Sequence, residues 1–249
     1  MMRRIPRRLP LAALGPVLLL GAGGLAFAPR ALRQLDAFRV QRVEVIGTRF
    51  LEPYAVVRAA GLGDRASVFD DAGRWRAGVL TLPLVEDVRV RRKLPGSVEL
   101  VVTEVEPVAL VAGPELRAVD AAGWLLPLDP AGAGLDLPLL SGIEARGGRL
   151  VPEAGARQAL DALVALRRDA PELADRVSQI ERRPGLLRVV FRDETAEALL
   201  PVDASGLQLR QLRLAYEDLV SRGELWKVRR IDLRFRDQVV VSFLASPVS

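Results

Sequence analysis

The residue types that most often perform chemistry in proteins are scarce in this chain. Its 249 residues include no cysteine and no histidine, which excludes disulfides, thiolate nucleophiles and the two commonest ligands of catalytic zinc. No G-x-S-x-G segment occurs, and a serine nucleophile would lack its usual histidine base. The sequence therefore predicts a protein that is not an enzyme and that needs no cofactor or metal.

Adjacent acidic residues are the remaining candidates for acid–base chemistry. Asp70 lies beside Asp71, and Asp193 lies beside Glu194. At the start of a helix or in a turn, such carboxylates more simply accept hydrogen bonds from backbone N–H groups. A periplasmic hydrolase acting on the cell wall is the enzyme alternative, and these pairs give it little support.

The net charge of +5 is concentrated near the N-terminus. Residues 1–33 hold six arginines and no acidic residue, so the rest of the chain is close to neutral. A neutral body lacks the basic face that binds nucleic acid. We therefore expect neither a nucleic acid partner nor a small-molecule substrate.

A long apolar segment overlaps this basic region. Residues 9–28 contain no charge, and a helix of that length spans about 30 Å, the thickness of the hydrocarbon core. Because more arginines precede the segment than closely follow it, we predict a single-pass anchor with residues 1–8 in the cytoplasm, a linker at 29–38 and the rest outside. The alternative is a signal peptide cleaved after Ala26-Phe27-Ala28, which would release a secreted binding module, although Pro29 after the cut opposes it.

The next part of the chain predicts a small α+β domain. Residues 40–46 alternate between apolar and polar types, and residues 82–109 contain two alternating runs joined by Leu94-Pro95-Gly96. Between them we predict two short helices, one at 53–60 capped by Gly61 and one capped by Asp70 or Asp71. The predicted order is strand, helix, helix, strand, strand.

The remainder predicts a mixed α/β domain with a mainly antiparallel sheet. Its last strand is predicted to lie at a sheet edge, where unpaired N–H and C=O groups can accept a strand from a partner. Strands are predicted at 107–111, 117–120, 124–126, 186–191, 197–200, 228–235 and 239–244, and helices at 154–168 and 207–220.

Several of these segments resemble a bacterial cell-division family. The sequences VEVIGTRFL and LPLVEDVRVRRKLPGSVELVV resemble the opening strand and closing hairpin of a POTRA domain, and the segments 104–109, 119–123, 137–142 and 231–235 resemble the family FtsQ, also called DivIB. The resemblance covers nearly the whole chain and implies a POTRA domain at 39–107, an FtsQ-type β domain at 108–244 and a tail at 245–249. Thr48 and Val105 depart from the family, which often has Asn and Arg there.

This resemblance implies a divisome scaffold without catalytic activity. It implies a protein of the inner membrane at the division septum, which binds FtsB-like and FtsL-like single-pass proteins and helps control septal peptidoglycan synthesis. Phe243 is then an aromatic anchor and Arg234 a clamp for a partner carboxylate. The alternative is that the terminal valines and Phe243 complete the core and that Arg234 is solvated. The positions that match the family's partner-binding region are Arg234, Phe235, Val239, Val241, Phe243 and Arg183.

Other interpretations remain open at this point. POTRA domains also occur in envelope proteins that transport or assemble other proteins, although an outer-membrane barrel needs eight or more strands. The POTRA domain either contacts other division proteins or acts as a spacer. Trp75 and Trp124 are predicted to be core residues, whereas Trp226 is compatible with core or surface.

Overall fold

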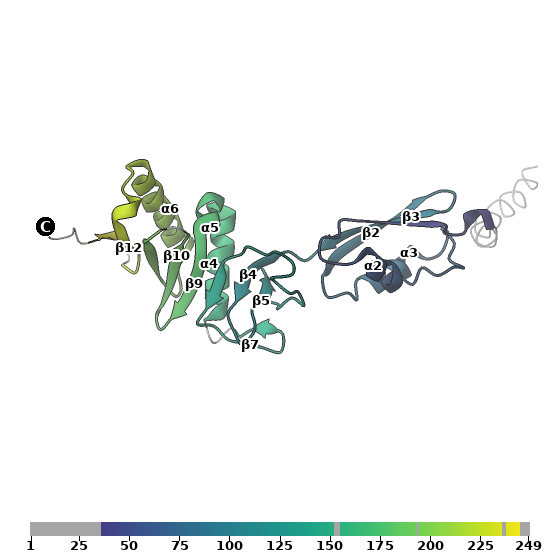
Figure 1. The fold of residues 1–249 in the computed structure, drawn as a ribbon, viewed down its shortest axis with the longest axis horizontal. Coiled ribbons are helices and arrows are strands. Elements are labelled where there is room, and N and C mark those ends of the chain that lie inside the picture. The colour runs from purple at the N-terminus through teal and green to yellow at the C-terminus, as the bar shows by residue number, and fades with distance from the viewer. Residues whose placement is uncertain (1–35, 152–154, 193, 236–237, 245–249) are drawn as a thin grey trace, which may run out of the picture. The chain divides into compact units, whose positions relative to one another are not determined.

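The computed structural model describes residues 36–151, 155–192, 194–235 and 238–244, which form two compact units (Figure 1). Unit 1 ends at Glu104 and unit 2 begins at Val105. The predicted anchor at 9–28 lies outside the described residues. Among the helices that are described, none combines the length and the apolar character that a membrane crossing requires.

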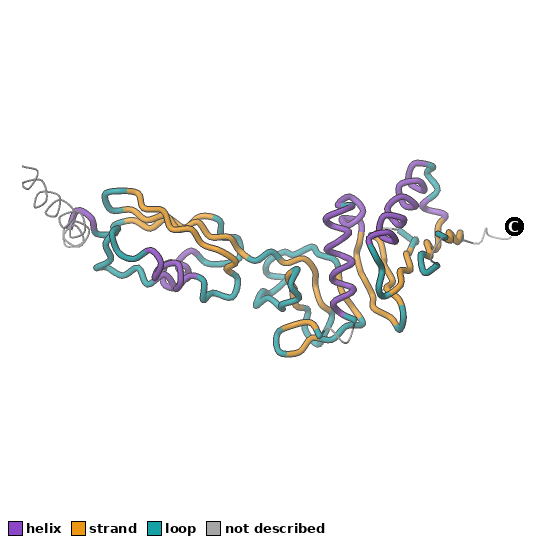
Figure 2. The backbone as a smooth tube through the Cα atoms, turned by 180° about the vertical axis from the view of Figure 1, so that it is seen from behind, coloured by secondary structure: helices purple, strands orange, loops and turns teal. Residues whose placement is uncertain are grey.

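Unit 1 packs two helices against one face of a three-stranded sheet (Figure 2). The strand order is β1-β3-β2, with β1 parallel and β2 antiparallel to β3. The predicted order of elements is confirmed, and Asp71 caps the second helix by accepting from Gly73 N at 2.9 Å. The elements are η2 (Asp36–Phe38), β1 (Arg42–Ile46), α2 (Pro53–Ala60), α3 (Ala72–Val79), β2 (Val85–Lys93) and β3 (Ser97–Glu104).

The turn after β1 is fastened to the end of β3. Gly47 has φ 91°, and a Cβ at this position would lie 2.2 Å from Val102 O, so only glycine fits. The Glu104 carboxylate then accepts three backbone hydrogen bonds, from Arg49 N at 3.0 Å, Phe50 N at 2.8 Å and Leu51 N at 2.9 Å. The Glu104 carboxylate therefore accepts the N–H groups of this turn in place of the carbonyl groups of a neighbouring strand.

Replacing Glu104 with glutamine is expected to destabilise unit 1 by about 1.5–3 kcal/mol, because the amide loses the charge and one of the two acceptor oxygens. Urea unfolding followed by the fluorescence of Trp75, which is buried in unit 1, measures this in full-length protein with the other two tryptophans replaced by phenylalanine. Glu106→Gln is the matched control, since Glu106 is exposed and its change is expected to stay within about 0.5 kcal/mol. Equal stability of the two variants would contradict the role of Glu104.

Unit 2 is built on an eight-stranded sheet with the order β13-β12-β11-β10-β9-β6-β4-β5. A separate two-stranded ribbon is formed by β7 and β8. The elements are β4 (Pro107–Val111), β5 (Arg117–Asp120), β6 (Leu139–Ser141), β7 (Ala145–Arg146), β8 (Arg149–Leu150), α4 (Ala156–Asp169), α5 (Pro171–Arg176), β9 (Val177–Arg183), β10 (Leu186–Phe191), β11 (Glu197–Pro201), α6 (Gly206–Ser221), η4 (Leu225–Lys227), β12 (Val228–Asp232) and β13 (Val240–Phe243).

The large sheet is mixed, and antiparallel pairs are in the majority, as predicted. The pairs β4–β6, β6–β9 and β11–β12 are parallel, and the other four neighbouring pairs are antiparallel. Two of the parallel pairs arise because helices connect their strands: α4 and α5 lie between β6 and β9, and α6 lies between β11 and β12. Such crossovers return the chain to the same end of the sheet.

The helices of unit 2 pack on one face of its sheet. Leu187 and Val189 of β10 point into the core with Leu163 of α4 and Leu212 of α6, and all four side chains are fully buried. Arg188 lies between the two buried β10 residues and points to the opposite face, as strand alternation requires. One face of the sheet is therefore apolar and covered, and the other carries charged side chains.

Three predicted features of unit 2 are wrong. Residues 124–126 form isolated bridges and no strand, and the strand predicted at 228–235 ends at Asp232. Trp124 is exposed and stacks under the Arg149 guanidinium at 4.9 Å, so it is not a core residue. The turn that holds Trp124, in which its backbone N–H donates to Asp120 Oδ1 at 2.8 Å, turns the ring toward Arg149 and away from the core. Trp75 is buried, as predicted.

Candidate partner-binding site

The two ends of the large sheet differ in whether their backbone groups are paired. At one end, Leu126 N donates to Ala118 O at 2.8 Å and Asp120 N donates to Trp124 O at 3.0 Å, so residues 124–126 cover β5. At the other end lies β13, and no described segment pairs with its outer side. The sheet therefore has one closed edge and one open edge, and the open one is the predicted C-terminal edge strand.

The outward-facing backbone groups of β13 follow from its pairing with β12. Leu244 N donates to Lys227 O at 2.7 Å, so it points toward β12. Because N–H and C=O groups of successive strand residues point to opposite sides, those of Val241 and Phe243 point away from β12. These two residues offer the backbone donors and acceptors that an added strand would use.

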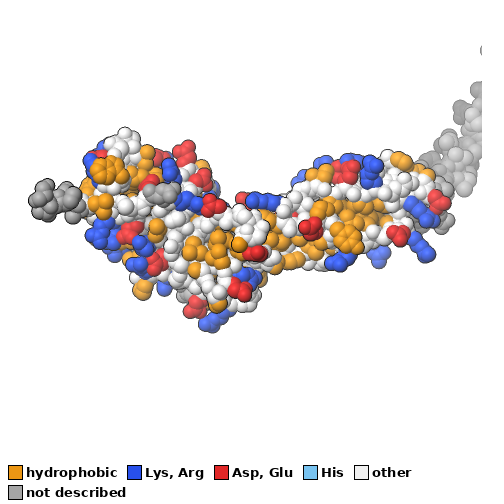
Figure 3. All heavy atoms as spheres, in the orientation of Figure 1, with side chains coloured by type: hydrophobic (Ala, Val, Ile, Leu, Met, Phe, Trp, Pro, Cys, Tyr) orange, Lys and Arg blue, Asp and Glu red, His pale blue; other side chains and the backbone are white. Residues whose placement is uncertain are grey.

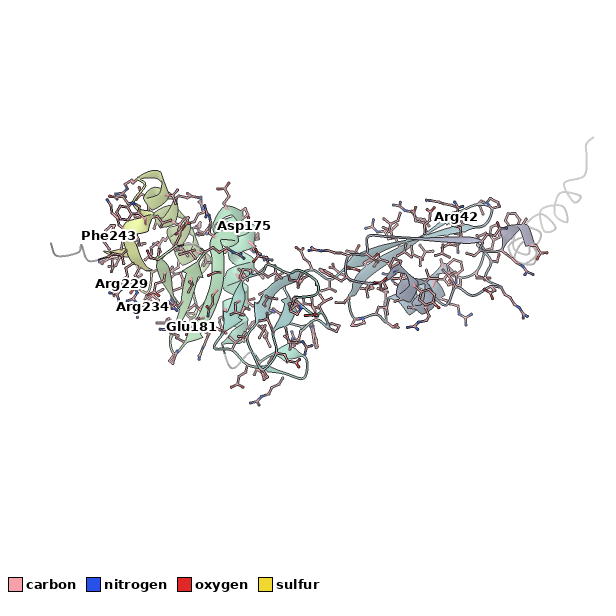
Figure 4. All side chains as sticks on the ribbon, in the orientation of Figure 1. Arg42, Asp175, Glu181, Arg229, Arg234 and Phe243 are labelled. Atoms are coloured by element: carbon pink, nitrogen blue, oxygen red, sulfur yellow. The ribbon has the colours of Figure 1, made fainter. Side chains whose placement is uncertain are left out.

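The side chains predicted to bind a partner divide into two groups. Val239 and Val241 are partly buried and pack against the core, which agrees with the alternative that they complete it. Phe235 and Phe243 are each 51% exposed. Phe243 is therefore exposed on the open edge (Figure 4), and Phe235 is exposed in the connection between β12 and β13.

Arg234 already has an acidic partner within the chain. Its Nε lies 2.9 Å from Asp232 Oδ1 and its Nη2 lies 2.6 Å from Asp232 Oδ2, a bidentate ion pair. The hydrogen bonds from Arg234 hold the pKa of the Asp232 carboxyl below its usual range, although burial acts in the opposite direction. Arg234 is thus ion-paired within the chain, while its side chain remains 43% exposed.

A row of ion pairs crosses the uncovered face of the sheet. Glu181 Oε2 lies 2.9 Å from Arg183 Nη2 and 3.2 Å from Arg188 Nη1. The Glu197 carboxylate pairs with Arg188 on one side and, at 2.6 Å, with Arg230 Nη2 on the other. Burial raises the pKa of Glu197, but hydrogen bonds from both arginines outweigh it and leave the pKa lowered. The hydrogen bond from Arg183 lowers the pKa of Glu181.

Arg183 belongs to this row and not to the open edge. Three strands separate β9 from β13, which corresponds to about 19 Å at the usual strand spacing. The structure therefore places Phe243 opposite Val228 at the start of β12, Arg234 and Phe235 beyond the end of β12, and Arg183 on β9. A partner that touches both regions has to extend across the sheet face.

A groove on the helical side of unit 2 was not predicted from the sequence. It has a volume of about 740 Å³ and lies between α5, the end of α6 and η4. Trp226 stands exposed at its rim, and Glu194 accepts the Tyr216 hydroxyl hydrogen bond at 2.8 Å within it. Burial, together with Glu194, raises the pKa of that hydroxyl. Hydrophobic side chains lie among charged ones over this part of the unit (Figure 3).

The acidic pairs that were weighed for catalysis have structural partners. Asp71 caps α3, Asp70 accepts from Ser67 N at 2.8 Å, and Glu194 holds Tyr216. Asp193 lies outside the described residues. Within the described part of the chain, no group of three acidic side chains is arranged to hold a metal ion.

Two family models match the chain in the order of the two units. The model described as POTRA domain, FtsQ-type matches residues 38–104. The model described as Cell division protein FtsQ/DivIB, C-terminal matches residues 109–234. The second match spans half of the chain and includes the large sheet except β13 and the first two residues of β4.

Curated relatives are similar over almost the full length. The Cell division protein FtsQ of Rhodothermus marinus is 30% identical over 93% of this chain and 87% of its own length. Those of Myxococcus fulvus and Anaeromyxobacter sp. are each 28% identical, over 93% and 94% of this chain and 84% and 81% of their own lengths. From the two family models and these relatives together, the chain belongs to the FtsQ/DivIB family of cell division proteins.

Proposed function

We propose that this protein is a non-catalytic scaffold of the divisome that binds FtsB-like and FtsL-like single-pass division proteins. Its anchor at 9–28 holds it in the inner membrane with residues 1–8 in the cytoplasm and both units outside. At the septum it links early and late division proteins and helps control peptidoglycan synthesis. The absence of cysteine and histidine supports a binding role over a catalytic one.

The open edge of β13 carries this proposal. Val241 and Phe243 present unpaired backbone groups there, and the exposed Phe243 ring lies beside them. An extended partner segment would gain backbone hydrogen bonds along β13 and would bury the ring. Buried aromatic side chains of this kind dominate many interfaces, at about 2 kcal/mol or more each.

Arg234 offers a second contact beyond the end of β12, through its ion pair with Asp232. This pair fixes the guanidinium at the end of β12. A partner carboxylate bound there would share the arginine with Asp232, because guanidinium carries further N–H donors. Truncation of Arg234 would also leave the largely buried Asp232 unpaired, so its variants mix binding and folding effects.

Co-purification with the full-length protein tests the proposal. We expect the chain solubilised from membranes to carry FtsB-like and FtsL-like proteins, and Phe243→Asp to lose them. An interfacial aspartate would remove the aromatic contact and bury a charge, which weakens binding by about 30-fold or more. Because Phe243 is half exposed, the variant is expected to keep its circular dichroism spectrum and its unfolding midpoint.

The matched control is Leu116→Asp, at a side chain that is 46% exposed and precedes the closed strand β5. This variant is expected to retain both partners. Retention of partners by Phe243→Asp would remove the site, and co-purification of envelope transport components alone would contradict the scaffold function.

A further inference from the structure

Three chain segments meet at one end of unit 1. Val40 N donates to Ala66 O and Gln41 N donates to Gly96 O, both at 2.8 Å, and Arg42 is in register with Ser97. Residues 36–42, 63–67 and 92–97 are therefore neighbours, and we call this set the proximal end. Arg42 marks it in Figure 4.

The proximal end is basic and carries an exposed apolar side chain. Its segments contain five basic residues and two acidic ones, and Lys and Arg side chains gather around it (Figure 3). Leu94, in the loop between β2 and β3, is 63% exposed. The charged residues are Arg39, Arg42, Arg65, Arg92 and Lys93 on one side and Asp36 and Asp64 on the other.

Several of these cations have no carboxylate partner. Arg42 and Arg65 are exposed and form no ion pair with any described residue. Arg92 donates to the Asp70 backbone carbonyl at 2.8 Å and to no described carboxylate. Lys93, in contrast, is held by Glu44 and Glu99. Among the described residues, Arg42 and Arg65 therefore have no carboxylate partner, and Arg92 keeps further N–H donors beside the one bound to Asp70.

The sequence limits how far this end can lie from the apolar segment. That segment ends at Ala28, eight residues before Asp36, and eight residues span at most about 28 Å. The opposite end of unit 1 lies about 30 Å from the proximal end, because β2 has nine residues. Tyr54, at the start of α2 beyond the turn after β1, lies at that opposite end.

We propose that the proximal end binds the surface of an anionic phospholipid bilayer, with Leu94 at the interface and Arg42, Arg65 and Arg92 against lipid phosphates. Guanidinium groups bind phosphate through paired N–H donors, and a basic surface with an apolar tip fits the bilayer interface. The proposal rests on the proposed anchor and adds a second contact, which orients unit 1 on the membrane.

The absence of cysteine permits a direct test. Full-length Leu94→Cys protein carrying one environment-sensitive fluorophore is reconstituted into nanodiscs of phosphatidylcholine alone or mixed with phosphatidylglycerol. Lipids with a nitroxide near the headgroup are expected to quench about half of the fluorescence in anionic discs and about a tenth in neutral ones. The control label at Tyr54→Cys, a side chain that is 74% exposed, is expected to show little quenching in either disc.

Charge variants separate lipid binding from simple proximity. Adding Arg42→Gln and Arg65→Gln to the labelled protein is expected to reduce quenching in anionic discs to the neutral level, and high salt is expected to do the same by screening. Equal quenching in neutral and anionic discs would overturn the lipid contact but not the anchor. The absence of quenching in a chain that co-purifies with the discs would do the same. A chain that fails to insert would overturn the anchor, and this proposal with it.

Discussion

Val241→Pro is expected to weaken binding of the FtsB-like partner by about 100-fold or more while leaving β13 in the sheet. The Val241 N–H points away from β12, so proline removes no hydrogen bond of the chain itself. A partner strand added to β13 would lose the hydrogen bond from the Val241 N–H, so one carbonyl of the partner would stay unpaired. The proline ring would also clash with the partner strand. These losses together amount to about 2.7 kcal/mol or more, which corresponds to the 100-fold change.

Two variants of the same strand make this experiment specific. Val241→Ala keeps the N–H and is expected to change affinity by less than about fivefold, since the valine side chain packs mainly against the core. Ser242→Pro removes an N–H that faces β12 and is expected to detach β13. Titration of detergent-solubilised full-length chains measures affinity, and hydrogen exchange of β12 reports the attachment of β13. Binding by Val241→Pro within about threefold of the unchanged chain would exclude strand addition.

Depletion of the protein is expected to stop septation completely, giving filaments with segregated nucleoids. The family identifies the chain as a division protein, and a scaffold that recruits later components has no substitute once it is absent. Expression of the unchanged chain or of Leu116→Asp is expected to restore division. Phe243→Asp is expected to fail, because the loss of one interface anchor of about 2 kcal/mol or more leaves too little complex at cellular concentrations.

Cell length and membrane staining measure this outcome, with immunoblots to confirm equal levels of the variants. Normal constriction after complete depletion would contradict the division function. Rescue by Phe243→Asp, in contrast, would leave the family assignment intact and would remove only the open edge as the essential contact.

Local patterns predicted the elements of unit 1 well. The helix at 53–60 has the predicted bounds, because a proline begins it and a glycine ends it. The alternation of Val98, Leu100 and Val102 places their side chains in the core, as predicted. In both cases the signal lies within the segment itself, so no knowledge of distant partners is required.

The arrangement of unit 2 depended on contacts that no local pattern records. Residues 177–183 form the central strand β9, but a bulge in its pairing with β10 breaks the apolar alternation there. The parallel pairs depend on which strands become neighbours after the helices have packed. The family resemblance supplied the order of the domains and not this sheet order.

The sequence predicted that the last strand lies at the edge of the sheet, and the structure has β13 there with Phe243 on it, whereas Arg183 lies four strands away. That these residues bind a partner stays a prediction. The ion pair of Arg234 with Asp232 could be predicted from the sequence, because side chains two residues apart in an extended segment lie on the same face. No sequence pattern predicts the groove beside Trp226, because α5 and η4, which line it, are both short and lie far apart in the sequence.

The covering of β5 by residues 124–126 limits how large an assembly this sheet can form. A sheet with two free margins adds copies from both sides and grows into an open-ended fibre. If the open edge accepts a partner strand as proposed, growth would stop after a single addition, so each copy would take up one extended segment and the product would have a finite size. Two copies joined through their β13 strands would also form a closed pair, in which neither molecule has an edge left for another protein, so self-association would compete with recruitment.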